Sequence, residues 1–223
     1  MTDVASLKKA FKNKDLFDLA LTHRSWVNEH KGVRNHNERL EFLGDAVLEY
    51  VVSKVLYEKF PEKEEGYLTA LRSNLVNTVS LGTLAKELKL GAIIYLSKGE
   101  EEGGGRENTS LLADTVEAII GAIFIDRGLA DAEEFIDSSL LSDLKARASE
   151  PLKDNKSRLQ ELVQSKKLSA PRYGVVEESG PDHSKKFIIE VTVDGKTWGV
   201  GEGKSKSLAE QAAAGHALEE NVE

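Results

Sequence analysis

Residues 111–125 read LLADTVEAIIGAIFI, a stretch in which Asp114 and Glu117 are the only charged residues. Apolar residues fill nearly all other positions, and this pattern predicts a helix that is buried on almost every side. The two acids are three residues apart, so they share one helical face. A buried carboxylate without a partner is strongly destabilising, and the stretch contains no Lys, Arg or His. We therefore expect something outside this helix to neutralise the pair.

A second acidic helix is predicted over residues 37–52, NERLEFLGDAVLEYVV. At about 100° per residue its acids fall on one stripe between apolar shoulders, and they are Glu38, Glu41, Asp45 and Glu49. Most acidic stripes are ordinary solvated faces, because Asp and Glu are usually exposed. This helix alone therefore does not predict a site.

The two helices together predict more than either does alone. If they pack against each other, four of their carboxylates form one cluster, made up of Glu41, Asp45, Asp114 and Glu117. Hard oxygen ligands without sulfur suit Mg²⁺, with Mn²⁺ as a substitute. The alternative that the residues leave open is a core in which Arg72 or Arg106 pairs with these acids.

The apolar spacing is helical up to about residue 148. Within this part we expect helices at residues 16–21, 40–60, 67–88, 111–125 and 130–144. No convincing alternating strand is found there, which predicts an all-α domain at residues 1–148. The next residues, 149–155, contain a proline and mixed charges without periodicity and are expected to form a linker.

The pattern changes after the linker and predicts a small α+β domain at residues 156–223. Its expected elements are a helix at 157–165, alternating strands at 173–177, 187–193 and near Trp198, and an Ala-rich helix at 207–219. An Asp194-Gly195 turn joins the second and third strands. The predicted order is therefore α-β-β-β-α.

The composition is that of a globular protein, with 40% hydrophobic and 30% charged residues. No cysteine occurs, which excludes disulfides and thiolate metal sites. Residues 1–15 carry charges throughout and lack an apolar signal core, so we expect a soluble, cytoplasmic protein without a membrane partner. The net charge of −8 does not exclude nucleic acid, because residues 1–150, with 19 basic and 26 acidic residues, hold −7 of it.

Residues 37–45, NERLEFLGD, resemble the signature of bacterial ribonuclease III in an uninterrupted match. LTHRS at 21–25, EGYLTALRSNLVN at 65–77 and the region 104–121 are similar to the same family. The resemblance extends over essentially the whole chain. It implies a Mg²⁺-dependent endonuclease that cuts double-stranded RNA and works as a homodimer without a small-molecule cofactor.

The same resemblance implies four metal ligands, which are Glu41, Asp45, Asp114 and Glu117. Of these, Asp45 and Glu117 are expected to act in catalysis as well. Glu38 and Glu65 resemble additional acidic positions of the family and rank second. His23, in LTHRS, is expected to be a packed imidazole and not a general base.

The implied reaction is hydrolysis of a phosphodiester, whose transition state gains negative charge and needs both neutralisation and an activated water. By resemblance the products carry 5′-phosphates, 3′-hydroxyls and short 3′ overhangs, and the substrates include ribosomal RNA precursors and other structured transcripts. Crowded carboxylates should raise one another's proton affinity, so metal binding should weaken in acid. Two alternatives stay open: an RNA-binding protein that does not cut, and a hydrolase of small phosphates.

The second predicted domain resembles the double-stranded-RNA-binding domain in KSRLQELVQ at 156–164, GPDH at 180–183 and GEGKSKS at 201–207. The resemblance implies that the first and second segments meet successive minor grooves and that the third meets the phosphates between them. The side chains implied in these contacts are Gln160 and Gln164, then His183, then Lys204 and Lys206.

One departure concerns the start of the last helix. The family often has paired lysines there, whereas this chain reads Lys204-Ser205-Lys206-Ser207. A helix start is a natural phosphate seat because its free N–H groups and its dipole both favour an anion. With serine where another lysine is frequent, we expect a somewhat reduced phosphate affinity.

Overall fold

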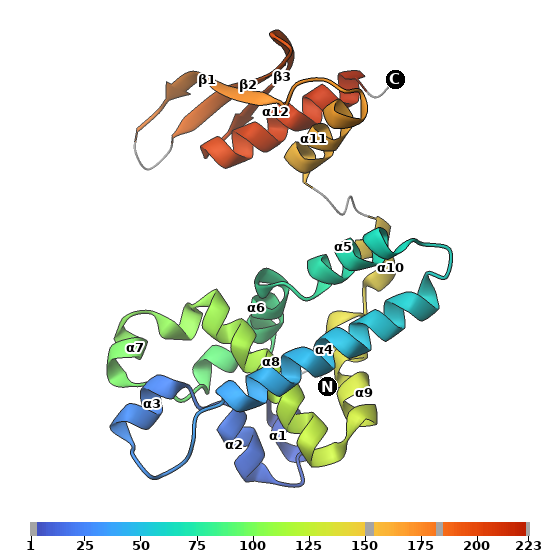
Figure 1. The fold of residues 1–223 in the computed structure, drawn as a ribbon. Coiled ribbons are helices and arrows are strands. Elements are labelled where there is room, and N and C mark those ends of the chain that lie inside the picture. Colours follow the sequence, from blue (N-terminus) through green and yellow to red (C-terminus); the bar gives the residue numbers. More distant parts are fainter. Residues whose placement is uncertain (1–3, 150–153, 182–184, 222–223) are drawn as a thin grey trace. The chain divides into compact units, whose positions relative to one another are not determined.

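The computed structural model describes residues 4–149, 154–181 and 185–221. Residue contacts divide the chain into two compact units, 1–150 and 151–223. Figure 1 draws both units.

Within the described residues, the first unit consists of α-helices and short 3₁₀ turns. They are α1 Val4–Ala10, α2 Lys14–Ala20, α3 Arg24–Glu29, α4 Glu38–Lys59, α5 Glu65–Leu75, α6 Thr78–Glu87, η1 Leu90–Ala92, α7 Lys98–Glu102, η2 Gly105–Glu107, α8 Thr109–Arg127, α9 Leu129–Leu140 and α10 Leu144–Ser149. The predicted all-α class is confirmed. Among the short helices, the one expected at residues 16–21 is observed as α2, whereas α1, α3, α7 and α10 are not predicted, because so few residues seldom show a clear period.

The helix predicted at residues 67–88 is wrong as a single element. The structure ends α5 at Leu75 and starts α6 at Thr78. The Asn77 side chain accepts the N–H of Ser80 at 2.9 Å and so caps the start of α6. An Asn side chain competes for backbone groups in this way, and it breaks a pattern whose apolar spacing alone looks continuous.

Helix α8 forms the centre of the first unit, and α4 crosses it (Figure 1). Val116, Ile119 and Ile120 on α8 are fully buried. The Asn108 side chain accepts the N–H groups of Ser110 and Leu111 and fixes where α8 begins. Although α8 is mostly apolar, none of the helices in the described ranges has the length and apolar character needed to cross a membrane.

Two glycines allow α4 and α8 to come very close. A Cβ added at Gly44 would overlap the main-chain carbonyl of Glu117, and one added at Gly121 would overlap the carbonyl of Leu40. Each helix therefore uses a glycine to admit the backbone of the other. Glycine in a helix interior lowers stability by about 1 kcal/mol relative to alanine, and here the close crossing offsets that cost.

In the second unit, the elements in the described residues are α11 Asn155–Ser165, β1 Arg172–Ser179, β2 Lys186–Val193, β3 Lys196–Gly203 and α12 Lys206–Asn221. The strands form an antiparallel sheet of order β1-β2-β3. The predicted order α-β-β-β-α is confirmed. Val191 and Val193 alternate along β2 and face a core that Leu159 of α11 and Ala213 of α12 complete.

The predicted turn at Asp194-Gly195 joins β2 to β3. Both residues have positive φ, 48° and 76°, as the tight turn of a hairpin requires. Along β3, a Cβ at Gly199 or Gly201 would overlap the backbone of α12 near Ala213. This glycine-rich strand and Ala-rich helix thus lie in close contact.

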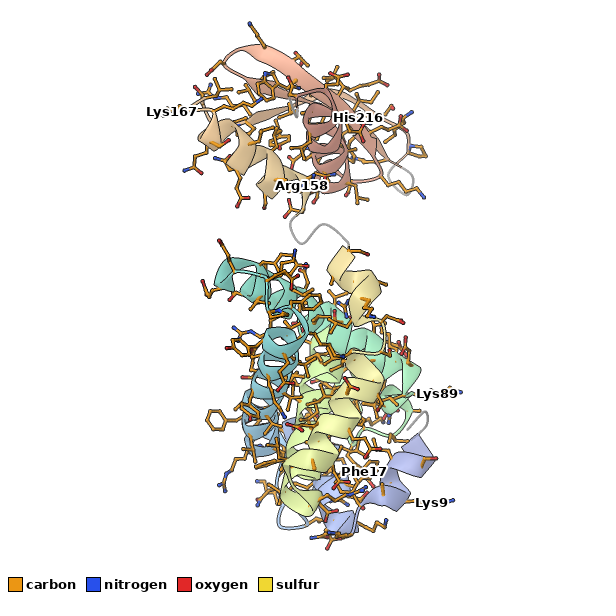
Figure 2. All side chains as sticks on the ribbon, turned by 90° about the vertical axis from the view of Figure 1, so that its right-hand side faces the viewer. Lys9, Phe17, Lys89, Arg158, Lys167 and His216 are labelled. Atoms are coloured by element: carbon orange, nitrogen blue, oxygen red, sulfur yellow. The ribbon has the colours of Figure 1, made fainter. Side chains whose placement is uncertain are left out.

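Figure 2 shows the placed side chains on both units. In the helical unit, Phe17 lies in the interior and is 1% exposed, whereas Lys9 and Lys89 project outward. These residues therefore lie as the sequence pattern predicts, with the apolar side chain in the core and the charged side chains at the surface.

Candidate metal centre and nucleic-acid interface

Three acids from α4 and α8 come together in the first unit. Glu41, Asp114 and Glu117 each offer a carboxylate oxygen, and these oxygens all lie within 4.8 Å of one another. Glu41 lies in the first turn of α4, and the other two share one face near the start of α8. The convergence predicted for these three acids is therefore present in the structure.

Asp45 lies one turn after Glu41 on α4 and is exposed. Its oxygens are not part of the set that falls within 4.8 Å. Its charge nevertheless acts on the site, since it helps to raise the pKa values of Glu41 and Glu117. The structure therefore places Asp45 beside the cluster, and its role as a ligand stays a prediction.

The carboxylates are less buried than the sequence pattern suggested. Glu41 and Glu117 are half-buried and Asp114 is exposed, while their neighbours on α8, Ala113 and Val116, are buried. The expectation of a helix buried on nearly all sides is correct for the apolar residues and wrong for the acids. They lie on a face of α8 that is at least partly open to solvent.

The surroundings of the site raise the pKa values of its acids. Partial burial is the largest cause that raises the pKa of Glu117 to about 7, and repulsion by Asp45, Asp114 and Glu41 adds to it. Burial also raises the pKa of Glu41, reinforced by Asp114, and burial raises that of Asp114. The predicted effect of neighbouring carboxylates is present at Glu41 and Glu117, whereas the rise at Asp114 comes from burial.

The alternative of an arginine-neutralised core is wrong. Nε of Arg72 contacts Oε2 of Glu49 at 2.8 Å, and Nε of Arg106 contacts Oε1 of Glu101 at 2.7 Å. In the part of the chain that the structure describes, no ion pair involves Glu41, Asp114 or Glu117. Glu49, the last acid of the predicted stripe, thus forms an ion pair with Arg72 and does not belong to the cluster.

The two secondary acids lie in different surroundings. Glu38, at the start of α4, is 3.3 Å from Nη1 of Arg24 and 3.6 Å from Nδ1 of His36. Glu65 begins α5 and accepts a hydrogen bond from the Thr69 hydroxyl at 3.2 Å. Within this chain neither acid belongs to the 4.8 Å set.

His23 caps the start of α3, where its Nδ1 accepts the N–H of Ser25 at 3.3 Å. Burial lowers its pKa, although the charge of Glu100 partly opposes this effect. The imidazole is thus held by local contacts, as expected for a packed residue. The positive charge of a protonated His23 would lower the pKa of Asp114, so His23 lies close to the site, although it does not belong to the 4.8 Å set.

The donor set fits a hard divalent cation. It offers carboxylate oxygens alone, it lacks a cationic partner among the described side chains, and burial together with repulsion among its acids raises the pKa of Glu117 to about 7. A divalent ion would remove that repulsion, and Mg²⁺ and Mn²⁺ prefer oxygen ligands of this kind. Carboxylates must be deprotonated to bind, so cation and proton compete for the same oxygens.

The predicted RNA-contacting residues of the second unit are mostly surface residues. Gln160 and Gln164 are exposed four residues apart on α11, whereas the neighbouring Leu159 and Val163 are buried. They therefore share one accessible face. His183 lies outside the described residues.

Lys204 and Lys206 flank the start of α12, and both are exposed. The Ser205 hydroxyl between them accepts the N–H of Leu208 at 3.3 Å, so this serine caps the helix. The ammonium of Lys206 lies 5.7 Å from the centre of the Phe187 ring. Ser207, which stands where the family often has another lysine, is exposed in the first turn of α12.

Sequence reasoning missed the residues that bring the acids together. Gly44 and Gly121 permit the close crossing of α4 and α8, and Arg24 with His36 holds Glu38. The glycines carried a signal, because an isolated glycine inside a helical pattern often has a packing reason. Arg24 and His36 gave no such signal in the sequence, because their contacts with Glu38 depend on the path of the loop between α3 and α4.

Comparison with known proteins gives a match for each unit. A family model described as ribonuclease-III-like matches residues 13–144, and one described as double-stranded RNA binding motif matches residues 155–221.

Curated relatives match along almost the whole chain. A protein named Ribonuclease 3 from Streptococcus pneumoniae (strain P1031) is 44% identical over 214 residues, which cover 96% of this chain and 92% of the relative. Ribonuclease 3 from Streptococcus gordonii (strain Challis) is 46% identical over 210 residues, or 94% and 90% of the two chains.

Solved structures agree for the helical unit. The nuclease domain of ribonuclease III from Campylobacter jejuni is 41% identical, with a TM-score of 0.57, over 64% of this chain and 97% of that one. A second structure of that domain, which describes flexibility in a region involved in dimer formation, is 43% identical with a TM-score of 0.55 and covers 61% and 95%.

The helical fold with its carboxylate cluster, joined to an RNA-binding module, defines a nuclease that acts on RNA. The matches to both units and to full-length relatives then settle the family. This chain belongs to the ribonuclease III family and is an endoribonuclease specific for double-stranded RNA.

Proposed function

We propose that this endoribonuclease hydrolyses its RNA duplex with Mg²⁺ held by Glu41, Asp114 and Glu117, and with Asp45 completing the site. Mn²⁺ is expected to substitute. The observation that carries the proposal is the convergence of three carboxylates within 4.8 Å without a cationic partner among the described residues. When bound, the cation would supply charge neutralisation and an activated water. We further propose products with 5′-phosphates, 3′-hydroxyls and short 3′ overhangs.

Each acid has a distinct setting for this role. Glu117 is half-buried and has a pKa of about 7, so it competes most strongly for a proton until a cation enters. Asp114 is exposed, so its carboxylate would be accessible to a substrate. Asp45 raises the pKa of both Glu41 and Glu117, and its own charge adds to the attraction for a cation at the open side.

The second unit is proposed to hold the duplex. Gln160 and Gln164 present one face of α11 to a minor groove, and Lys204 and Lys206 present charge at the start of α12 to phosphates. His183 keeps its predicted role at the neighbouring groove. Because grooves are recognised mainly by shape and by 2′-hydroxyls, duplex RNA would be preferred to duplex DNA.

We also propose a homodimer that uses the outer stripe of α4. Phe42, Tyr50 and Tyr57 are 80%, 54% and 75% exposed, and their spacing places them on one side of the helix. Tyr57 also lines a cavity of about 550 Å³ whose surface is mostly apolar and includes Leu56 and Leu68, with Lys63, Glu65 and Arg72 among its polar residues. Exposed aromatic residues beside such a hollow favour an association surface.

The decisive experiment is incubation of the protein with a long RNA duplex, with and without Mg²⁺, followed by mapping of the product ends. Cleavage only with the cation, leaving 5′-phosphates and short 3′ overhangs, supports the proposal. Single-stranded RNA and duplex DNA serve as controls. Binding without any cleavage would instead show a protein that only holds RNA. Action in the cytoplasm on ribosomal RNA precursors and other structured transcripts stays a prediction.

A further inference from the structure

Arg34 belongs to the loop between α3 and α4, whose path Figure 1 shows. Its guanidinium lies over two aromatic rings. Its central carbon is 4.5 Å from the ring centre of Tyr95 and 5.1 Å from that of Trp26. The two rings are themselves 5.6 Å apart, and His30 stacks on Trp26 at 4.1 Å. None of the ion pairs found within the described ranges includes Arg34.

The same guanidinium is connected to the start of α4 by hydrogen bonds. Nη1 of Arg34 donates to the hydroxyl of Thr22 at 3.5 Å, and Thr22 is fully buried. The carbonyl of Thr22 accepts the N–H of Asn37 at 2.9 Å. The Asn37 side chain, in turn, donates to the carbonyl of Ala20 at 3.0 Å.

Asn37 leads directly to the acidic site. Its carbonyl accepts the N–H groups of Leu40 at 2.8 Å and Glu41 at 3.0 Å, which are the first hydrogen bonds of α4. The place where α4 begins, and therefore the position of the Glu41 carboxylate, depends on where Asn37 is held. Next to it Glu38 contacts His36, which belongs to the same loop as Arg34.

Tyr95 closes the arrangement from a different part of the chain. Its N–H donates to the carbonyl of Leu21 at 2.9 Å, and its own carbonyl accepts the N–H of His23 at 3.1 Å. The backbone of Tyr95, whose ring lies under Arg34, is thus hydrogen-bonded to the residues on either side of Thr22. The guanidinium of Arg34 therefore links its own loop to the segment with Thr22, and this segment in turn holds the start of α4.

We propose that Arg34 is a positioning residue for the nuclease reaction, which acts through Thr22 and Asn37 to set the register of Glu41 against Asp114 and Glu117. The inference rests on the proposed role of these acids. A guanidinium can stack on two rings and donate a directed hydrogen bond at the same time, which an ammonium does less well. Small displacements of a positioned group lower turnover strongly, by up to about a hundredfold for a shift of roughly 1 Å.

The test compares Arg34→Met and Arg34→Lys with Lys31→Met, which removes the same charge from an exposed position in the same loop. Turnover and KM for duplex RNA are measured against Mg²⁺ concentration. Mn²⁺ binding is measured separately by electron paramagnetic resonance, so that one readout does not depend on activity. Melting temperatures show that each variant is folded at the assay temperature.

We expect Arg34→Met to lower kcat by roughly tenfold to a hundredfold, with KM for RNA within about twofold of the original protein. The half-saturating Mn²⁺ and Mg²⁺ concentrations should rise severalfold, and Arg34→Lys should recover part of both losses. Lys31→Met should behave like the original protein. A merely structural role would lower the melting temperature and leave the metal dependence of the folded protein unchanged.

Three results would overturn the inference: unchanged kcat and Mn²⁺ affinity in Arg34→Met, a loss of kcat with unchanged Mn²⁺ affinity, or an equal loss in Lys31→Met. If Arg34→Met does not fold, Arg34→Lys carries the same comparison. A protein that binds Mn²⁺ yet never cuts duplex RNA would refute the proposed function. The Mn²⁺ affinities of the variants would still decide the role of Arg34.

Discussion

The α-carbon of Gly44 lies against the main-chain carbonyl of Glu117, and no side chain separates α4 from α8 at this point. Gly44 is three residues after Glu41 on α4, so this contact fixes how near the Glu41 carboxylate comes to the acids of α8. Gly121 makes the reciprocal approach to the carbonyl of Leu40. The metal centre thus depends on two residues that have no side chain of their own.

Gly44→Ala is expected to push the helices apart, because its methyl group would overlap the Glu117 carbonyl. Overpacking of this kind typically destabilises by about 1–3 kcal/mol. Chemical denaturation measures the loss, and the half-saturating Mg²⁺ concentration should rise with it. Gly66→Ala on α5 is the matched control, because a Cβ there meets nothing within 4 Å. Equal stability of the two variants would contradict the role given to the crossing.

Glu117→Gln is expected to abolish cleavage, with a loss of at least about a hundredfold, while duplex binding is retained. The amide keeps the size of the side chain and removes its charge. Because repulsion by Asp45, Asp114 and Glu41 is also removed, the variant should melt at a higher temperature than the original protein in chelator. Cleavage assays and thermal melts measure both effects. Glu49→Gln, which affects an acid paired with Arg72, should still cut, and undiminished cleavage by Glu117→Gln would remove Glu117 from the mechanism.

The pH dependence follows from the pKa of Glu117, about 7 against an ordinary value of 4.5. Between these values the folded protein holds a proton that the unfolded chain has released, so metal-free stability rises as pH falls from about 7 towards 4.5. Metal affinity should change in the opposite direction and weaken by roughly tenfold per pH unit below 7 for each proton displaced. Denaturation and Mn²⁺ titrations between pH 5 and about 8 check both slopes. A stability slope that is the same in Glu117→Gln would argue against this assignment.

Replacement of both Lys204 and Lys206 by alanine should weaken duplex binding about evenly across sequences. Each lysine that neutralises a phosphate contributes roughly one unit to the slope of log affinity against log salt concentration. The slope should therefore become shallower by about two. Lys196→Ala is the control, because Lys196 lies at the opposite end of β3. If the double variant keeps the original salt slope, these lysines do not contact phosphates.

Phe42→Glu should shift the protein from dimer to monomer, because a charge would replace an aromatic ring that is 80% exposed in the single chain. Analytical ultracentrifugation over a range of concentrations measures the change. Val79→Glu is the control, since Val79 is 69% exposed on α6, away from the α4 stripe. A Phe42→Glu protein that sediments as the original dimer would place the interface elsewhere.

Much of the secondary structure could be predicted from the sequence because long amphipathic or alternating stretches show their period directly. The helix predicted at 111–125 is observed as Thr109–Arg127, and the strand predicted at 187–193 as Lys186–Val193. The break between α5 and α6 could not be predicted from the period, since one Asn77 side chain decides it. The short helices α3 and α7 depend on caps and contacts with the rest of the fold.

The sequence by itself determined that α8 is apolar apart from two acids on one face, and that α4 carries a stripe of acids, because spacing along a helix fixes which side chains share a side. Only the tertiary structure decided which acids meet. Glu49 pairs with Arg72, and Asp45 lies beside the cluster without belonging to it. Glu41 meets the acids of α8 because two glycines allow the backbones of the two helices to come into contact. The physical reason is that a helical period determines direction around one axis, whereas the distance between two axes depends on what is packed between them.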